Sequence, residues 1–388
     1  MTSPQPPAGE LRVVIAAGGT GGHIYPAIAI AQALIARNPN ARILFIGTRE
    51  RMEARVVPAA GFDLATIAVR GLRGRQPLLR RARSVWSLLS GRSLRHSLRL
   101  LRMHRPNVVI GTGGYVSGPV ILAARLLGVP RVTVVLDQSP GFTSRVTTRM
   151  SQALCVVSEQ AAGHCRKLIG DRARIEVTGN PIRREIIETT REQALAALGL
   201  APDRLTIVGT GGSLGSRALN TAFAGAVERL AADEAIARRI QILHLTGSSE
   251  PIRADEAALS SAGIPYQARE YLDEMHLAFA AADIVITRGG AMSLAEVTAR
   301  GIPAIVIPWS EASGNEQEHN ARPLAEVGAA IIIHDADLNA GVLARMLREV
   351  IEDDERREAM ARRSKALGRP DAAERVAAVI EEVASAGA

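Results

Sequence analysis

The sequence predicts an α/β protein built from two parallel-sheet domains. Short runs of β-branched residues are followed by glycine-rich loops and then by apolar residues at helical spacing, first over 13–34 and again from Leu205 onward. This alternation is typical of βαβ units, whose strands pair in parallel. The chain has 388 residues, of which 47% are hydrophobic. That is enough apolar material for two cores.

The first glycine loop, Gly18-Gly-Thr-Gly-Gly-His23, separates a strand pattern from a helix pattern over 27–34. Glycines let the backbone approach a ligand, and the free N–H groups at a helix start favour anions. Thr20 adds a hydroxyl donor. His23 is a candidate general base because an imidazole accepts protons near neutral pH, although it could instead only cap or fill the loop. The loop lacks the spacing of a dinucleotide fingerprint, and no acid ends the next strand (43–48), which disfavours a nicotinamide oxidoreductase.

A strongly basic segment begins with Arg70 and ends with Arg105. It holds eleven arginines interleaved with leucines and Trp86, and it contains no acidic residue. Such a pattern favours an anionic membrane surface as partner. Nucleic acid competes for the same arginines, but few aromatics and no recognisable nucleic-acid module support it. An ordinary solvated helix pair is the remaining alternative.

Charge and cysteine content narrow the class of protein further. Residues 1–180 carry a net charge of +17 and residues 181–388 a net charge of −9, so the two halves are expected to face different partners. No apolar run is long enough to span a bilayer and the start lacks a signal-peptide core, so we expect a cytosolic protein. Cys155 and Cys165 have no partners at metal-site spacing, which predicts buried thiols without a disulfide or zinc.

A second glycine loop, at 111–114, follows the strand that begins near Asn107. Two such loops at adjacent strand ends would flank one crevice, where open α/β sheets bind ligands. The strand at 132–136 ends at Asp137, which could bind a hydroxyl group or could simply belong to the turn before Pro140. Gly179-Asn-Pro181 breaks regular structure. We place the domain boundary there, giving domains 1–180 and 181–368.

The second half repeats the strand, glycine loop and helix order. Ser213 and the amides of its loop are set to hold a phosphate, and the helix that opens at Gly290 offers a second anion site. Glu296, one turn into that helix, could accept both hydroxyls of a ribose, or could act as a capping-box partner. The later polar loop offers Glu316 and Gln317 to sugar hydroxyls.

Asp335-Ala-Asp337 matches the metal-binding Asp-x-Asp of some sugar-nucleotide enzymes. It precedes a helix predicted over 338–351, so N-capping is the favoured interpretation, and no metal is expected. A final amphipathic helix is predicted over 371–383.

Taken together, these motifs resemble one family in order along nearly the whole chain. The matching motifs are Gly18-Gly-Thr-Gly-Gly-His23 with Pro26, Gly113-Gly-Tyr-Val-Ser-Gly-Pro119, Gly179-Asn-Pro-Ile-Arg183, Gly211-Gly-Ser213, Gly290-Ala-Met-Ser-Leu-Ala-Glu296, Gly301-Ile-Pro303, Gln317 with Asn320-Ala321, and Pro370-Asp-Ala-Ala-Glu-Arg375. The family is that of the bacterial MurG-type transferases. These add N-acetylglucosamine, from its UDP donor, to undecaprenyl-pyrophosphoryl-N-acetylmuramyl-pentapeptide.

The resemblance implies a GT-B architecture, with two Rossmann-like domains facing across a cleft and a C-terminal helix, within 369–388, that returns to the first domain. It implies a second domain that binds UDP-N-acetylglucosamine and a first domain whose basic, apolar face lies on the inner leaflet, so that the protein is peripheral on the cytoplasmic side of the membrane. It also allows for a complex with other cell-wall enzymes. The substrate-binding residues that it implies are Thr20, Gly21, Gly22, Tyr115, Ser139, Arg183 (near the uracil), Ser213, Leu272, Ala291, Met292, Ser293, Leu294, Ala295, Glu296 and Gln317.

The sequence also departs from the family pattern. The family's His-Glu-Gln-Asn stretch reads Leu136-Asp-Gln-Ser139 here, and the loop that follows is two residues shorter. Leu214 and Glu316 each replace a glutamine. These changes fall in the acceptor loop and the donor loops and leave room for an altered acceptor.

The predicted reaction is a single inverting displacement. His23 is the candidate base, with Asp137 orienting it or acting in its place, and loop amides stabilise the leaving pyrophosphate, so that neither a metal nor a cofactor is required. The alternatives are another UDP-sugar transferase with a different lipid acceptor, a UDP-N-acetylglucosamine epimerase, and a nucleotide-sugar-binding protein without turnover.

Overall fold

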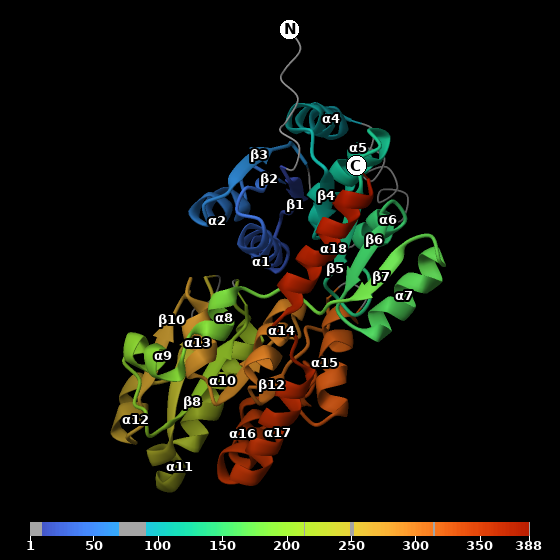
Figure 1. Cartoon of the computed structure of the whole chain (residues 1–388). Coiled ribbons are helices and arrows are strands. Elements are labelled where there is room, and N and C mark those ends of the chain that lie inside the picture. The colour runs from blue at the N-terminus through green and yellow to red at the C-terminus, as the bar shows by residue number, and fades with distance from the viewer. Residues whose placement is uncertain (1–9, 70–90, 213, 249–251, 313–314, 388) are drawn as a thin grey trace. The chain divides into compact units, whose positions relative to one another are not determined.

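The computed structural model describes residues 10–69, 91–212, 214–248, 252–312 and 315–387. The chain folds as two compact units, residues 1–183 with 371–388 and residues 184–370 (Figure 1). The sequence placed these divisions a few residues earlier, at 180 and 368. The last helix, α18 (Ala372–Ala386), belongs to the first unit, where it packs on α1 (Gly21–Arg37).

The first unit is built on a seven-stranded parallel sheet in the order β3-β2-β1-β4-β5-β6-β7. Its strands are β1 (Arg12–Ala16), β2 (Arg42–Gly47), β3 (Asp63–Thr66), β4 (Val108–Gly111), β5 (Arg131–Val135), β6 (Ala153–Val156) and β7 (Arg174–Val177). Its other helices are α2 (Glu53–Ala59), α4 (Arg92–His104), α5 (Gly114–Leu126), α6 (Phe142–Thr148) and α7 (Glu159–Ile169). The central strands are buried on both faces, as a parallel sheet covered by helices requires.

The second unit repeats this design with a six-stranded parallel sheet in the order β10-β9-β8-β11-β12-β13. Its strands are β8 (Leu205–Thr210), β9 (Ile240–Leu245), β10 (Tyr266–Arg269), β11 (Ile284–Thr287), β12 (Ala304–Val306) and β13 (Ala330–Ile332). Its helices are α8 (Arg184–Glu188), α9 (Arg191–Leu198), α10 (Arg217–Leu230), α11 (Glu234–Arg239), α12 (Glu256–Ser261), α13 (Met275–Ala281), α14 (Ala291–Arg300), α15 (Glu316–Glu326), α16 (Ala340–Glu352) and α17 (Asp354–Leu367).

In each sheet the direction of the strand order reverses at one place. The reversal lies between β1 and β4 in the first unit and between β8 and β11 in the second. Loops that leave the carboxyl ends of such strand pairs diverge to opposite faces of the sheet and open a crevice for a ligand. All four of these loops are glycine-rich. The fold therefore sets up one candidate crevice in each unit.

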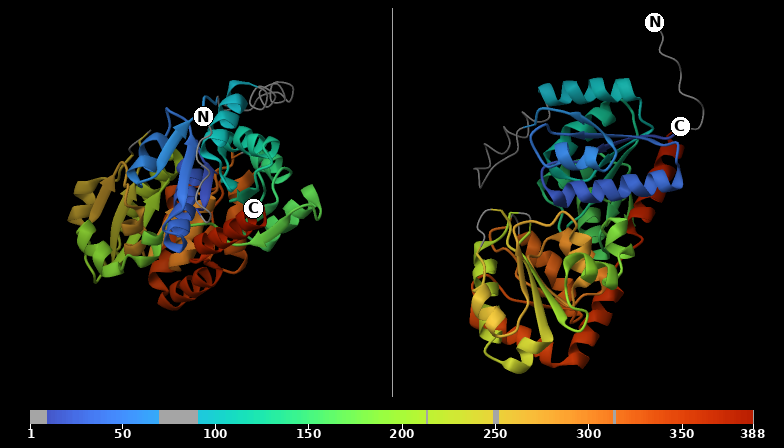
Figure 2. Two further views of the ribbon diagram at one scale, coloured as in Figure 1. Left: turned by 45° about the horizontal axis from the view of Figure 1, so that its top comes forward. Right: turned by 90° about the vertical axis from the view of Figure 1, so that its left-hand side faces the viewer.

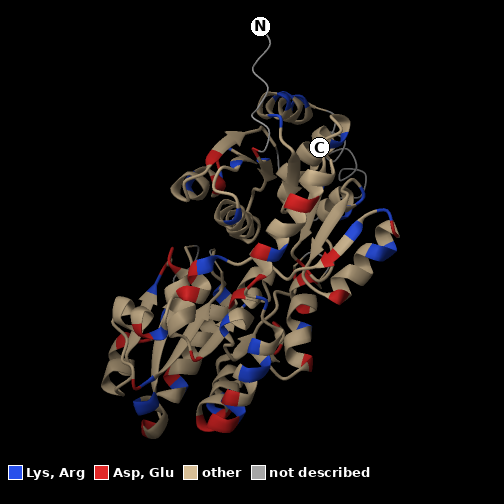
Figure 3. Ribbon diagram, in the orientation of Figure 1, with Lys and Arg blue, Asp and Glu red and all other residues tan. Residues whose placement is uncertain are grey.

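The described part of the basic segment is α4, which packs on α5 (Figure 2). Its partly buried Leu94, Leu98 and Leu100 and its buried Leu101 join a core with β1, β4 and α5. Figure 3 marks the arginines of this helix in blue on the ribbon, and the exposed ones are Arg92, Arg95, Arg99 and Arg102. These leucines therefore stabilise the fold, and the outer face of α4 offers mainly cations. The rest of the basic segment, residues 70–90, lies outside the described residues.

Candidate active site

The two glycine loops of the first unit lie against each other. A Cβ added to Gly114 would fall 2.1 Å from the carbonyl oxygen of Gly18, so only glycine permits this approach. The buried Ser117 hydroxyl lies 3.0 Å from the carbonyl oxygen of Ala16 and 2.6 Å from that of Gly113, and so links the ends of β1 and β4. The loops that the sequence placed at adjacent strand ends thus form one crevice.

His23 lies in the first turn of α1, at the edge of this crevice. Its Nδ1 is 3.3 Å from Thr20 Oγ1, and its carbonyl accepts a hydrogen bond from Thr112. A Cβ added to Gly113, whose φ is +105°, would fall 2.5 Å from the imidazole Cδ2. The backbone of the second loop therefore fixes where the ring lies. Thr20 is the N-cap residue of α1, so His23 does not cap the helix.

Two carboxylates act on the His23 imidazole. Burial lowers the pKa of His23, while the charges of Asp137 and Glu53 act in the opposite direction. The imidazole is therefore neutral at pH 7 and can accept a proton. Glu53 was not predicted as a site residue, because it lies thirty residues from His23 in sequence and only the pairing of β1 with β2 brings it close.

Asp137 and Ser139 lie in the loop after β5, both half-buried. This loop is held at several points: Asn180 Nδ2 donates to the carbonyl of Leu136 at 2.8 Å, and His164 Nδ1 lies 2.9 Å from the carbonyl of Gln138. Leu136 is itself buried. The leucine that replaces the family's histidine thus belongs to the core.

Tyr115 is the second residue of α5, beside the second glycine loop, and is half-buried. Arg183 is the last residue of the first unit, and its guanidinium lies 4.3 Å from the centroid of the Tyr25 ring. The resemblance implied a place for Arg183 near a uracil in the second domain. In the structure its guanidinium contacts the Tyr25 ring of α1, and the place near a uracil stays a prediction.

In the second unit, Arg288 connects the loops that follow β8 and β11. Its guanidinium donates to Ser216 Oγ at 2.6 Å, to the carbonyl of Ile307 at 3.1 Å and to Asp335 at 2.5 Å. Only 12% of the side chain is exposed. Ser216 caps α10, so the cation lies directly beside the start of that helix. Arg288 was not predicted as a site residue, because nothing in its sequence context marks it as buried.

Asp335 corrects one prediction. It was expected to cap the helix that follows it, but Asn339 caps α16, by accepting from the amide of Val342. Asp335 instead pairs with Arg288 and accepts from both the amide and the hydroxyl of Ser310. Burial acts to raise the pKa of Asp335, but these hydrogen bonds outweigh it and the pKa is lowered. Among the described residues no cluster suited to a metal ion is found.

Gln317 ties two loops of this crevice together. Its side-chain oxygen accepts from the amide of Gly289 at 3.1 Å and from the amide of Trp309 at 2.9 Å. A Cβ added to Gly289 would fall 2.3 Å from the carbonyl oxygen of Gln317. With the oxygen used in this way, the amide nitrogen of Gln317 remains to donate to a ligand.

The helix α14 opens at Gly290, whose lack of a side chain leaves its first amides accessible to an anion. Ala291, Met292 and Ser293 form the first turn, followed by Leu294, Ala295 and Glu296. Glu296 is 8% exposed, and because Gly290 is the N-cap it cannot be a capping-box partner. Leu272 is buried in the loop after β10, and Ser213 lies outside the described residues.

The model of the glycosyltransferase family 28 N-terminal domain matches residues 13–156, and that of the family 28 C-terminal domain matches residues 206–376. The chain belongs to glycosyltransferase family 28. The first family 28 domain holds His23 and Asp137, and the second holds Arg288 and Gln317.

Relatives within this family show which kind of family 28 transferase the chain is similar to, and they confirm the resemblance to MurG-type transferases. A protein of Moorella thermoacetica named "UDP-N-acetylglucosamine--N-acetylmuramyl-(pentapeptide) pyrophosphoryl-undecaprenol N-acetylglucosamine transferase" is 39% identical, covering 97% of this chain and 100% of its own. A protein of the same name from Halothermothrix orenii is 40% identical, covering 96% and 99%.

Solved structures agree with the GT-B fold. The crystal structure of Acinetobacter baumannii MurG has a TM-score of 0.71 at 25% identity, covering 96% of this chain and 99% of its own. A UDP-GlcNAc 2-epimerase from Neisseria meningitidis has a TM-score of 0.68 at 14% identity, covering 96% and 100%. The second likeness shows the fold alone.

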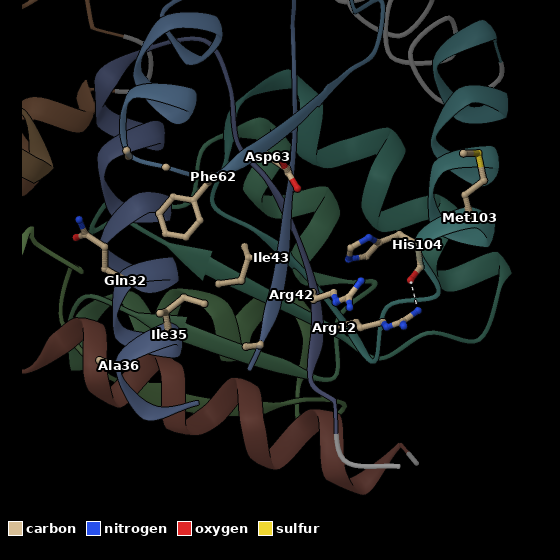
Figure 4. A pocket seen from close by; sticks show the side chains of 13 residues that line it. Arg12, Gln32, Ile35, Ala36, Arg42, Ile43, Phe62, Asp63, Met103 and His104 are labelled. Atoms are coloured by element: carbon tan, nitrogen blue, oxygen red, sulfur yellow. Dashed lines mark hydrogen bonds between the residues drawn. The ribbon is translucent and has the colours of Figure 1, made fainter. Parts of the chain in front are cut away.

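The first unit also carries a hollow of about 850 Å³ that lies away from these residues (Figure 4). It is lined by Arg12, Arg42 and Asp63, the first residues of β1, β2 and β3. It therefore lies at the amino ends of these strands, whereas the glycine loops follow the carboxyl ends. Glu10 pairs with both arginines. The hollow contains no predicted site residue.

Proposed function

We propose that this family 28 enzyme transfers N-acetylglucosamine from UDP-N-acetylglucosamine to the 4-hydroxyl of undecaprenyl-pyrophosphoryl-N-acetylmuramyl-pentapeptide. The names of relatives 37–40% identical over nearly the whole chain support these substrates. The observation that carries the mechanism is the place of the His23 imidazole, which is held by the backbone of the second glycine loop and by Thr20 and on which the charges of two carboxylates act.

The reaction is a displacement with inversion at the anomeric carbon. The acceptor hydroxyl oxygen bonds to that carbon, the bond from the carbon to the UDP oxygen breaks, and UDP leaves with the electron pair. The hydroxyl proton passes to His23. When Nδ1–H donates to Thr20 Oγ1, Nε2 is the acceptor for this proton. The charge of Asp137 stabilises the imidazolium that forms.

The second unit binds the donor. The helix starts at Ser216 and Gly290 and the cation of Arg288 oppose the negative charge that grows on the departing pyrophosphate. Glu296 accepts from the ribose hydroxyls, and the Gln317 amide donates to the sugar. The remaining candidates of α14, with Leu272 and Ser213, contact the nucleotide through their backbone or hydroxyl groups.

The test is transfer of labelled N-acetylglucosamine to a short-chain, lipid-linked muramyl-pentapeptide, with the product identified by mass. The proposal requires the disaccharide with a β linkage. Formation of N-acetylmannosamine, either still linked to UDP or released by hydrolysis, would instead show an epimerase. UDP-sugar binding without either product would show a binding protein, and both outcomes contradict the proposal.

We also propose that the first unit attaches peripherally to anionic lipid at the cytoplasmic face of the membrane, through the four exposed arginines of α4. Each such arginine contributes about 1 kcal/mol near an anionic surface. The double substitution Arg95→Gln with Arg99→Gln should weaken binding to vesicles of phosphatidylglycerol and phosphatidylcholine about tenfold or more. The matched pair Arg356→Gln with Arg362→Gln, in α17, should not. Equal binding by both pairs would contradict the proposal.

A further inference from the structure

Glu53 is a completely buried carboxylate that the reaction described above does not use. Its Oε1 accepts from the amide of Thr48 at 2.9 Å and from the Thr48 hydroxyl at 2.6 Å, and its Oε2 accepts from the amide of Gly19 at 3.2 Å. All three donors are uncharged. Both oxygens are therefore required as acceptors, which a carboxylate provides and a carboxamide does not.

The surrounding backbone is shaped to admit this side chain. A Cβ added to Gly18 would fall 2.8 Å from Glu53 Oε1, and one added to Gly47 would fall 2.7 Å from Glu53 Cγ. Gly19, which donates to the carboxylate, has a φ of +108°. Glu53 thus joins the glycine loop after β1 to the end of β2, and it holds the loop in a conformation that favours glycine.

The loop that Glu53 holds is the one that leads into His23. Among the described residues, the charges that act on the imidazole are those of Asp137, from the loop after β5, and Glu53, from the start of α2. The loop before α5 presents the Gly113 backbone to the ring, and Thr20 presents a neutral hydroxyl. The two carboxylates therefore approach the imidazole from two different elements.

We propose that Glu53 is a positioning residue for the transfer reaction, which fixes the glycine loop beside His23 and places a carboxylate charge near the imidazole. The inference rests on the proposed function, in which His23 accepts the proton. Glu53 itself contacts neither substrate. It acts through the backbone at Gly19 and through its charge.

The test is an NMR titration of histidine-labelled protein, with the His23 signal assigned from its loss in His23→Gln. In Glu53→Gln the pKa of His23 should fall by roughly 0.5 to 1 unit, because a nearby negative charge has been removed. Glu50→Gln is the matched control, since Glu50 is an exposed carboxylate three residues before Glu53, between β2 and α2, and its removal should leave the titration unchanged. Glu53→Asp keeps the charge and should keep the pKa of His23 near the wild-type value.

Kinetics gives the second readout. In Glu53→Gln, kcat should fall about tenfold while the affinity for UDP, which the second unit binds, stays the same. An unchanged His23 titration in Glu53→Gln would overturn the proposal, as would a loss of UDP affinity equal to the loss of kcat. If the wild-type protein forms no disaccharide, the proposed function fails, but the titration still decides whether Glu53 acts on His23.

Discussion

The two crevices have the same backbone design but bury opposite charges. In the first unit the glycine loops surround an imidazole on which two carboxylates act, Glu53 and Asp137. In the second unit they surround a guanidinium, Arg288, which pairs with Asp335 and lies beside two helix starts. Carboxylates near an imidazole favour proton uptake, whereas a buried cation with free amides favours a phosphate. In the mechanism proposed above, the same fold serves proton transfer in one unit and anion binding in the other.

The largest expected loss of activity concerns Gly113, whose backbone lies against the His23 ring. Gly113→Ala should reduce transfer about 100-fold, because its Cβ would fall 2.5 Å from the His23 ring and displace it. Gly128→Ala is the matched control: Gly128 also has a positive φ, of +72°, but an added Cβ there meets nothing within 4 Å. Gly128→Ala should lose about 1 kcal/mol of stability from backbone strain alone, and Gly113→Ala should lose more, because the clash with the His23 ring adds to its strain. Equal activity in the two would contradict the placement of His23 by the second loop.

The corresponding change in the second unit is Arg288→Gln. It should weaken UDP binding about tenfold or more and cost about 3 kcal/mol of stability, because Asp335 loses its buried partner. Calorimetric titration with UDP and denaturant unfolding measure the two effects. Arg362→Gln, which removes one partner of an exposed pair with Glu358, should change neither by much. If Arg288→Gln binds UDP normally, the cation has no part in donor binding.

A smaller effect concerns the pH dependence of stability in the second unit. His244 is buried, with its Nδ1 2.7 Å from the Tyr266 hydroxyl, and burial lowers its pKa to about 4. The unfolded chain, with an ordinary histidine pKa of about 6.5, binds the proton first, so stability falls as the pH drops from about 6.5 toward 4. Between pH 7 and pH 4.5 the wild type should lose about 2 kcal/mol more than His244→Gln. Denaturant unfolding at the two pH values measures this difference, and parallel losses would contradict it.

The strands that the sequence indicates, such as those at 43–48, at 132–136 and from Leu205, are central strands of the two sheets, and the edge strands carry no such pattern. The strands that it missed are β3, β7, β10 and β13, which are the two edges of each sheet. Edge strands are short and only half-buried here, so they lack the continuous apolar runs that mark central parallel strands. Apolar patterns in a sequence reflect which residues are buried, so the patterns are weaker in strands that are only partly buried.

The site divides in the same way. The glycine loops and His23 could be read from sequence, because their chemistry is concentrated in a few consecutive residues. Glu53 and Arg288 could not, because their contacts come from strand pairing and from burial that local sequence does not show. The prediction that Asp335 caps the following helix was wrong for the same reason. Asn339 caps α16, while Asp335 pairs with Arg288, which follows a different strand.

The most direct test of the central claim is the pH dependence of single-turnover transfer, with donor saturating, in the wild type and in His23→Gln. The wild-type rate should rise with pH through a midpoint below 6.5, because burial lowers the pKa of His23. In His23→Gln the rate should no longer rise with pH in this way and should be lower by a factor of about 10² to 10⁴, while UDP binds normally. A His23→Gln variant that kept both the wild-type rate and its rise with pH would contradict the account. Another group would then accept the proton of the acceptor hydroxyl.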